Sequence, residues 1–188
     1  MVKNDDETSL LQLLVDTFAV LHDSINTHAN PPADSFLAGV DPDDWNVLQW
    51  RPATWQASPD AISAIRFIGR LPKLYEMLAL SYRWPQVDLG VCRLLPNEPA
   101  CDLQPLATAM LSDPVLNHTL IPAGYVRFAI AGDNYDPICF DLNHFAADDC
   151  PIVRLEHESI LMHGSIGTYD TIFPTFRELV STVVGSFD

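Results

Sequence analysis

Two cysteines and two histidines fall within one short stretch of the C-terminal half, and four such side chains can hold zinc tetrahedrally. They are Cys139, His144, Cys150 and His157. Cys139, however, lies inside an apolar run that resembles a strand, and structural zinc sites usually bring their ligands in closely spaced pairs. We therefore interpret the cysteines as buried free thiols and expect no metal or cofactor.

Three aspartates, Asp133, Asp136 and Asp141, surround an expected turn at Asn134-Tyr135. Their spacing invites comparison with a calcium-binding loop, but the EF-hand pattern fails. It has no glycine at the sixth position and no glutamate that closes the loop. Aspartates that accept hydrogen bonds from their own turn backbone explain the pattern better.

Motifs for nucleophilic catalysis and phosphate binding are missing from the sequence. It has no Gly-x-Ser-x-Gly elbow, no cysteine-protease signature and no glycine-rich phosphate loop. A catalytic triad assembled from distant residues stays open at this point. We expect a protein that is not an enzyme.

Acidic residues dominate the 188-residue chain, with 25 acidic against 10 basic side chains and a net charge of −15. The acids are concentrated in residues 1–60 and 125–188, whereas residues 61–124 carry equal numbers of both signs. Such a field repels nucleic-acid phosphates and anionic lipids, so neither is an expected partner. It favours a basic protein partner, although acidity that only maintains solubility is the alternative.

The N-terminus is acidic where a signal peptide would be basic, and no apolar run approaches the ~20 residues that span a bilayer. We therefore expect a cytoplasmic protein without membrane association. The four cysteines, which also include Cys92 and Cys101, are too few for a disulfide scaffold and fit a reducing compartment.

The first expected element is an amphipathic helix. Ser9 and Gln12 fit a capping box, with Ser9 as the N-cap. Leu11, Leu14, Phe18 and Ile25 then follow helical spacing, so this helix is expected to bury one face. Leu10, Leu13 and Leu21 widen the apolar stripe.

Residues 29–60 contain five prolines, together with Trp45, Trp50 and Trp55. Proline excludes long helices and central strands, while the tryptophans argue against a floppy linker. We expect residues 1–57 to form an N-terminal helix and a wrapping segment. Residues 58–188 then form the main domain, and the two parts together make one globular unit.

Helix signals return at Ser58-Pro59-Asp60, with Gly69 as the expected C-cap. A second helix is expected from Leu71-Pro72 until Trp84-Pro85. The later half predicts strands over residues 89–95, 125–130, 137–142 and 151–155, and helices over residues 102–111 and 173–184. This order predicts an α+β fold with a central, mainly antiparallel sheet flanked by helices, plus an additional N-terminal helix.

Aromatic side chains gather near the end of the second of these helices. Tyr75 shares a helical face with Leu71, Leu78 and Tyr82 and is expected in the core. Trp84 follows the helix and is the better surface candidate. Because aromatic residues are enriched at binding hot spots, Trp84 is a candidate anchor for a partner.

Several segments together resemble the SUKH superfamily, which includes yeast cell-wall-assembly regulators and many bacterial immunity proteins. Leu71-Pro72 followed by Tyr75 resembles its LP-x-x-Y helix opening. Residues 132–141, GDNYDPICFD, resemble its turn-and-strand signature and are the most specific part of the match. Pro151-Ile152-Val153 and residues 176–179 resemble its next strand and last helix. The resemblance covers residues 58–184, but the asparagine-glycine turn common in members is replaced by Ser81 to Pro85.

This resemblance implies a non-catalytic α+β protein that neutralises a cognate polymorphic toxin, such as a nuclease, by direct binding. The expected partner is thus a basic toxin domain. We expect the contact surface to include Trp84, Asp133, Asp136, Asp148 and Asp149. A regulatory scaffold, as the yeast members suggest, is the alternative. A metal-dependent enzyme that uses the cysteine–histidine stretch is a third possibility.

Overall fold

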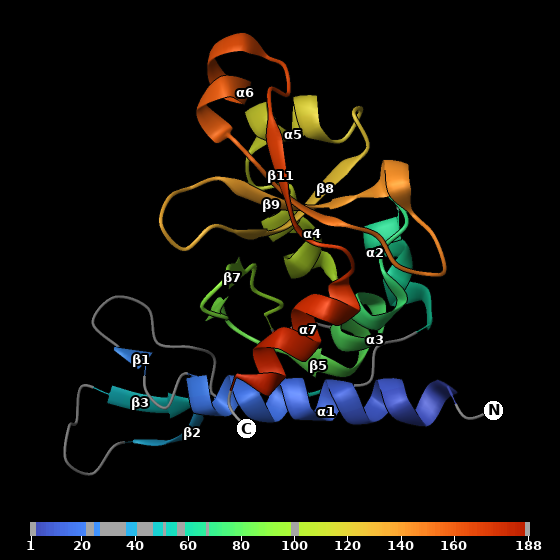
Figure 1. Ribbon diagram of the computed structural model, residues 1–188. Coiled ribbons are helices and arrows are strands. Elements are labelled where there is room, and N and C mark those ends of the chain that lie inside the picture. The colour runs from blue at the N-terminus through green and yellow to red at the C-terminus, as the bar shows by residue number, and fades with distance from the viewer. Residues whose placement is uncertain are drawn as a thin grey trace.

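The computed structural model describes residues 3–21, 25–26, 37–40, 47–50, 52–55, 59–66, 68–98 and 102–186 (Figure 1). The α-helices in these ranges are α1 (Lys3–Leu21), α2 (Ser63–Arg66), α3 (Lys73–Ser81), α4 (Gln104–Met110), α5 (Pro114–Leu120), α6 (His157–His163) and α7 (Phe176–Gly185). The 3₁₀ turns are η2 (Pro59–Ile62) and η3 (Leu142–His144).

The strands are β1 (Ile25–Asn26), β2 (Leu37–Val40), β3 (Val47–Trp50), β4 (Ala53–Thr54), β5 (Tyr82–Arg83), β6 (Val87–Asp88), β7 (Arg93–Leu94), β8 (Tyr125–Ile130), β9 (Pro137–Asp141), β10 (Ile152–Leu155) and β11 (Tyr169–Phe173). The main sheet is antiparallel throughout and has six strands in the order β11-β10-β9-β8-β7-β6. Together with the helices and α1, it confirms the expected α+β fold.

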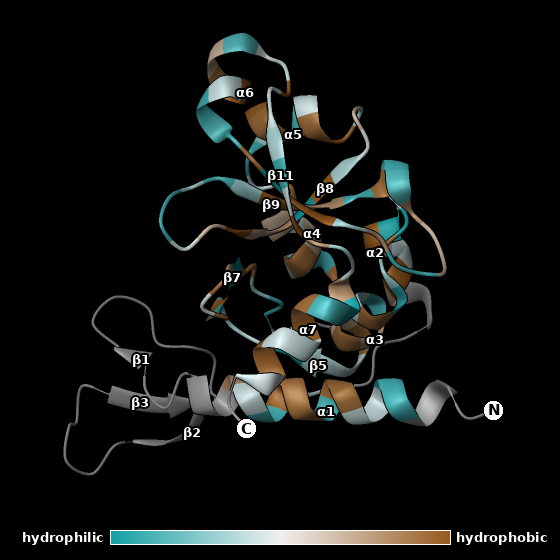
Figure 2. Ribbon diagram, viewed as in Figure 1, coloured by the Kyte–Doolittle hydropathy of each residue, from teal (hydrophilic) through white to brown (hydrophobic). Residues whose placement is uncertain are grey.

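The central strands β8 and β9 are buried along nearly their whole length, because helices cover the sheet. α4 and α5 contact β8, while α7 contacts both α3 and β11. α1 lies along the base of the molecule in Figure 1, where it packs against α3 and α7. Figure 2 shows the hydrophobic residues concentrated where the central strands meet these helices.

Four aromatic rings from distant parts of the chain meet at the centre of the core. Tyr75 packs edge-on against Phe140 and Phe176, with ring centroids 5.1 and 5.4 Å away. Phe128 on β8 stacks on Phe140 across the sheet at 4.0 Å. Each such contact contributes about 0.5–1.5 kcal/mol beyond the area it buries, so this cluster ties α3 and α7 to the sheet.

The capping box expected at the N-terminus is wrong. α1 begins at Lys3, so Ser9 lies inside the helix and does not cap it. Acidic residues such as Asp5 and Asp6 favour the first turns of a helix, which explains the earlier start. Gln12 instead donates to the Asp16 carboxylate at 2.8 Å.

The apolar face of α1 is confirmed in its central part. Leu11, Leu14 and Phe18 are buried, whereas Leu13 is half exposed. Ile25 does not continue this face, because α1 ends at Leu21 and Ile25 pairs with β3 as part of β1.

Strands β2 and β3 of the proline- and tryptophan-rich segment form a small antiparallel sheet with the preceding β1, in the strand order β1-β3-β2. A second pairing joins β4 to β5, so Ala53 and Thr54 lie beside the end of α3. Trp45, Ser58 and Cys101, which carried predictions above, lie outside the described residues.

The chain between α2 and α3 approaches the sheet closely. Gly69 has a φ of +148° and donates its N–H to the carbonyl of Arg66, the last residue of α2. A Cβ at this position would lie 2.5 Å from Cδ1 of Leu142. Gly69 lies three residues beyond the end of α2, so it is not the C-cap that was expected, and its positive φ is a conformation that other residues rarely adopt.

The strand expected over residues 89–95 is instead a hairpin of β6 and β7. Gly90, with a φ of +79°, turns the chain, and its N–H donates to the Asp88 carboxylate at 2.8 Å. Leu89 and Cys92 close the turn through a backbone hydrogen bond. The expected strands at 125–130, 137–142 and 151–155 are confirmed as β8, β9 and β10, and the expected helices at 102–111 and 173–184 as α4 and α7.

No helix among the described residues combines the length and the apolar character needed to cross a membrane.

Candidate functional site

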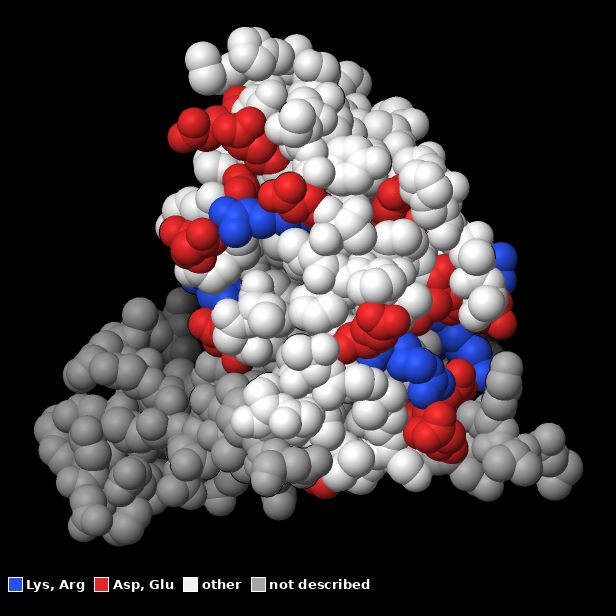
Figure 3. Space-filling view, viewed as in Figure 1, with Lys and Arg blue, Asp and Glu red and all other residues white. Residues whose placement is uncertain are grey.

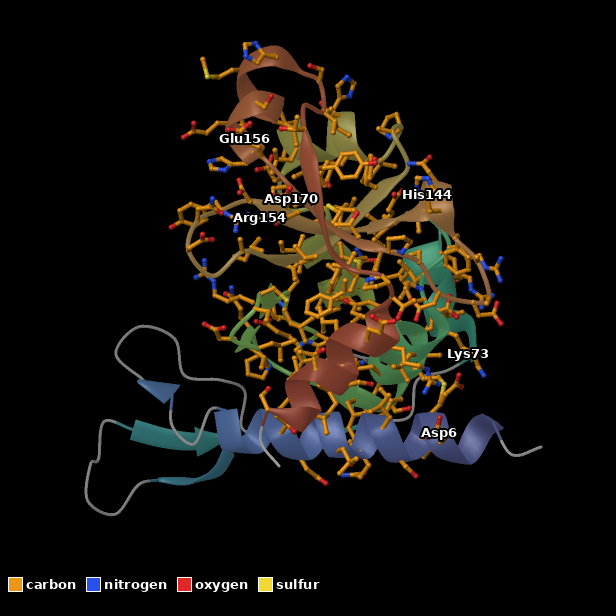
Figure 4. All side chains as sticks on the ribbon, in the orientation of Figure 1. Asp6, Lys73, His144, Arg154, Glu156 and Asp170 are labelled. Atoms are coloured by element: carbon orange, nitrogen blue, oxygen red, sulfur yellow. The ribbon has the colours of Figure 1, made fainter. Side chains whose placement is uncertain are left out.

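The candidate site is a surface formed by the β8–β9 turn, the ends of β10 and β11, and the start of α6. We call Asp133, Tyr135, Glu156 and Asp170, four exposed residues of these segments, the acidic face. Asp133 contacts the guanidinium of Arg154, and Asp170 lies opposite Arg154 in the sheet. Figure 4 shows Arg154, Glu156 and Asp170 close together on the same side of the sheet. In Figure 3, acidic side chains surround one basic group in this region.

Asp136 organises the turn beneath this face. Its carboxylate accepts hydrogen bonds from Nε of Arg154 at 2.9 Å and from the backbone N–H of His157 at 3.0 Å. It also accepts from the side-chain amide of Asn134 at 2.8 Å and lies 2.8 Å from Nδ1 of His157. Asp136 therefore connects three segments: the β8–β9 turn, β10 and α6.

The electrostatics of Asp136 follow from these contacts. Burial alone would raise the pKa of its carboxyl. The hydrogen bonds from His157, Asn134 and Arg154 outweigh burial and hold this pKa well below its ordinary range. The carboxylate is thus ionised and only 6% of the residue's surface is exposed, so Asp136 supports the turn and is not available to a partner.

Arg154 lies at the centre of the acidic face. Its side chain bonds to Asp136 and reaches Asp133 at 3.2 Å, and these contacts raise its pKa. Asp170 lies directly opposite Arg154 in the β10–β11 register, so the two side chains share a face of the sheet. Glu156 follows Arg154 by two residues and points to the same side.

The acidic face keeps a surplus of negative charge. Asp133, whose side chain is 66% exposed, shares Arg154 with Asp136. Among the described residues, neither Glu156 nor Asp170 takes part in an ion pair, and both are exposed. One cation therefore faces several carboxylates.

An exposed aromatic ring stands at the tip of the β8–β9 turn. Tyr135 is 73% exposed, between Asp133 and Asp136. Two further apolar side chains are exposed on α6, namely Leu161 and Met162. Large exposed aromatics of this kind are typical anchors of protein interfaces.

The prediction that Trp84 anchors a partner at the surface is wrong. Trp84 is fully buried, and its indole Nε1 donates to the carbonyl of Leu95 at 2.9 Å. Its ring packs edge-on against Phe18 of α1. After α3 the chain turns inward, because the backbone of Trp84 pairs with Asn97 through two hydrogen bonds.

The structure does not bring the four predicted aspartates together. Asp133 and Asp136 precede β9, whereas Asp148 and Asp149 follow it, beyond η3, so the two pairs lie at opposite ends of this strand. Asp149 accepts hydrogen bonds from the backbone N–H groups of Phe176 and Arg177 at 3.0 and 3.2 Å, at the N-terminus of α7. It therefore has a structural role.

The cysteines and histidines of the possible zinc site have separate surroundings. Cys139 and Cys150 are buried, which raises the pKa of both thiols, that of Cys150 to about 12. His144 lies 2.7 Å from the buried Asp141 carboxylate, while His157 lies against Asp136. Within the described part of the chain, no three His, Cys, Asp or Glu side chains form a group that could hold a metal ion.

Sequence reasoning missed Glu156, Asp170 and the role of Tyr135, because it expected neither α6 nor β11. One signal was present. Arg154 and Glu156 alternate with apolar residues at the end of an expected strand, which places both on its solvent side.

A comparison with models of known protein families gives no match, and a comparison with curated proteins gives none either.

Proposed function

We propose that this chain is a binding protein that uses the acidic face to dock onto a basic protein partner. The proposed partner is a toxin domain, such as a nuclease, which the chain neutralises in the cytoplasm without catalysing a reaction. The observation that carries this proposal is the combination of exposed carboxylates at Asp133, Glu156 and Asp170 with the exposed ring of Tyr135.

Electrostatics supports a basic partner. A nuclease is positively charged where it grips phosphate, and an acidic surface of opposite sign steers the encounter and covers those cations. The net charge of −15 adds a long-range field of the same sign. Binding through this face is therefore expected to weaken as salt screens the charges.

The acidic face is also held rigidly. The buried Asp136 ties the turn that bears Tyr135 to β10 and α6, so little order has to be gained when a partner binds. A pre-organised surface of this kind suits tight inhibition by simple occlusion.

The proposal of an immunity protein rests on the resemblance to the SUKH superfamily. Tyr75, Phe140 and Phe176 come from three of the segments that carry the resemblance, and their rings meet in one core cluster. The most specific segment, residues 132–141, supplies both part of this core and the turn of the acidic face.

Co-expression with toxins encoded beside the gene tests the proposal. We expect the chain to protect cells from one such toxin and to form a stoichiometric complex with it, and Tyr135→Ala to weaken the complex. Leu13→Ala, which removes a half-exposed apolar side chain from α1, is the matched control. Failure to bind or protect against any of these toxins would contradict the proposal, and capture of several regulatory proteins instead would favour the scaffold alternative.

A further inference from the structure

A cavity of about 470 Å³ lies between α2, α3 and the turn at residues 146–149, away from the acidic face. Three of its lining residues are the cations Arg66, Arg70 and Lys73, and two are the acids Glu76 and Asp148. Glu7, which lies 2.7 Å from Lys73, brings the carboxylates to the same number as the cations. In a chain with 25 acidic and only 10 basic residues, this local balance of charge is unusual. Figure 3 shows basic and acidic side chains next to one another in the region where Figure 4 labels Lys73.

Each of the three cations is paired with a carboxylate, and one of the pairs is widely exposed on both sides. Arg66, whose side chain is 61% exposed, lies 3.4 Å from Glu76, which is only 17% exposed, and Lys73 lies 2.7 Å from Glu7, which is 15% exposed. Arg70 lies 2.6 Å from Asp148, and both of these side chains are more than 60% exposed. An exposed pair contributes little net free energy, so a stronger anion can displace the carboxylate of Asp148 at little cost.

We propose that this cavity binds the phosphate group of a small phosphorylated molecule. A phosphate dianion presents several oxygens in a tetrahedral arrangement, which matches two guanidinium groups and one ammonium group better than a flat carboxylate does. Lys73 is also the first residue of α3, where the helix dipole adds a partial positive charge. The cavity volume lies in the range of small-molecule sites.

The charge of the whole chain limits the size of the ligand. A polyanion such as a nucleic acid would extend from the cavity over the acidic surface and meet repulsion there. A compact ligand with one or two phosphates avoids this repulsion. The cavity is separate from the acidic face. An experiment that contradicts phosphate binding would therefore leave the proposed function untouched, and the reverse also holds.

Asp148 distinguishes a ligand site from an ordinary surface ion pair. Its carboxylate contacts Arg70, where it competes with an incoming phosphate. Asp148→Asn removes this competitor, and asparagine tolerates the left-handed backbone that Asp148 adopts at φ +65°. Asp148→Asn is therefore expected to tighten phosphate binding, whereas Arg70→Gln weakens it.

The test is titration of the full chain with inorganic phosphate at constant ionic strength, followed by NMR chemical shifts or calorimetry. We expect saturable binding with a Kd at or below about 1 mM, and shifts centred on residues 66–76. Arg70→Gln is expected to raise the Kd about tenfold, and Lys73→Gln gives a second reading if Arg70→Gln proves unstable. The control Arg93→Gln removes one positive charge from β7 and is expected to leave the Kd unchanged.

Three results would overturn the proposal. NMR chemical-shift changes that grow linearly with phosphate concentration, without saturation, would show that the cavity has no phosphate site. An equal effect of Arg93→Gln and Arg70→Gln would show a response to net charge alone. Citrate, a carboxylate probe in a parallel titration, binding as tightly as phosphate would show that the cavity does not select phosphate.

Discussion

Nε of Arg154 donates to the buried carboxylate of Asp136 at 2.9 Å, which ties β10 to the turn between β8 and β9. The same carboxylate accepts the backbone N–H of His157 at the first residue of α6. One side chain therefore sets the relative positions of three of the four segments that form the acidic face.

Asp136→Asn is expected to destabilise the fold. The substitution removes the charge from a buried group that accepts four hydrogen bonds, and it leaves Arg154 without its closest counter-ion. We expect a loss of about 2 kcal/mol in the free energy of unfolding, measured by urea denaturation. Asp133→Asn is the control and is expected to cost less than about 0.5 kcal/mol, because that side chain is exposed. Equal losses for the two variants would contradict the role of Asp136.

The lowered pKa of Asp136 predicts a specific pH dependence. Because the folded-state pKa lies below the unfolded value of about 3.9, its contribution to stability is fully present above that value. The contribution is lost as the pH falls toward the folded-state pKa. Urea denaturation should give a difference in the free energy of unfolding between wild type and Asp136→Asn that is constant from neutral pH down to about pH 4. Below about pH 4 this difference should become smaller. A gap that grows with acid would show the opposite sign of the shift.

Trp84→Phe is expected to destabilise the protein and to leave partner binding by the folded fraction unchanged. The smaller ring leaves a cavity, and the carbonyl of Leu95 loses its donor. A loss of about 2–3 kcal/mol is expected from thermal or urea denaturation. An unchanged stability with weaker partner binding would restore the surface role that the sequence suggested.

Asp149→Ala removes the acceptor for two N–H groups at the start of α7. We expect a loss of about 1–2 kcal/mol in the free energy of unfolding, as for other helix caps. The neighbouring Asp148→Asn is the control, since its exposed pair with Arg70 contributes little and asparagine tolerates its left-handed backbone. If both variants were equally stable, Asp149 would have no structural role, and it would again be a candidate for partner contact.

The strands and helices that the sequence predicted well have local signals. Residues 125–130 and 137–142 contain dense apolar runs with a turn between them, and they became the two central strands. The two elements that were not predicted, α6 and β11, have only weak local signals in the sequence. α6 buries only Ile160 among its residues, so its sequence carries no apolar stripe, and β11 is an edge strand with three exposed positions. Local patterns do not reveal elements that are held mainly by their neighbours.

The candidate site was predictable only in part, because its geometry depends on long-range pairing. Asp133 belongs to a visible turn, but Asp170 comes to lie opposite Arg154 only through the β10–β11 register, which no local pattern reports. The prediction of a surface position for Trp84 was wrong for a similar reason. A helix that ends at Trp84-Pro85 is compatible with an exposed ring, and only the pairing with Asn97 brings that ring into the core.

Affinity for the proposed basic partner, measured for two double variants with equal loss of charge, tests the central claim most directly. Glu156→Gln with Asp170→Asn removes two charges from the acidic face, while Asp16→Asn with Glu98→Gln removes two exposed charges elsewhere. We predict that the first pair raises the Kd by about tenfold or more and that the second leaves it nearly unchanged. Equal effects of the two pairs, or no effect of the first, would contradict docking through the acidic face.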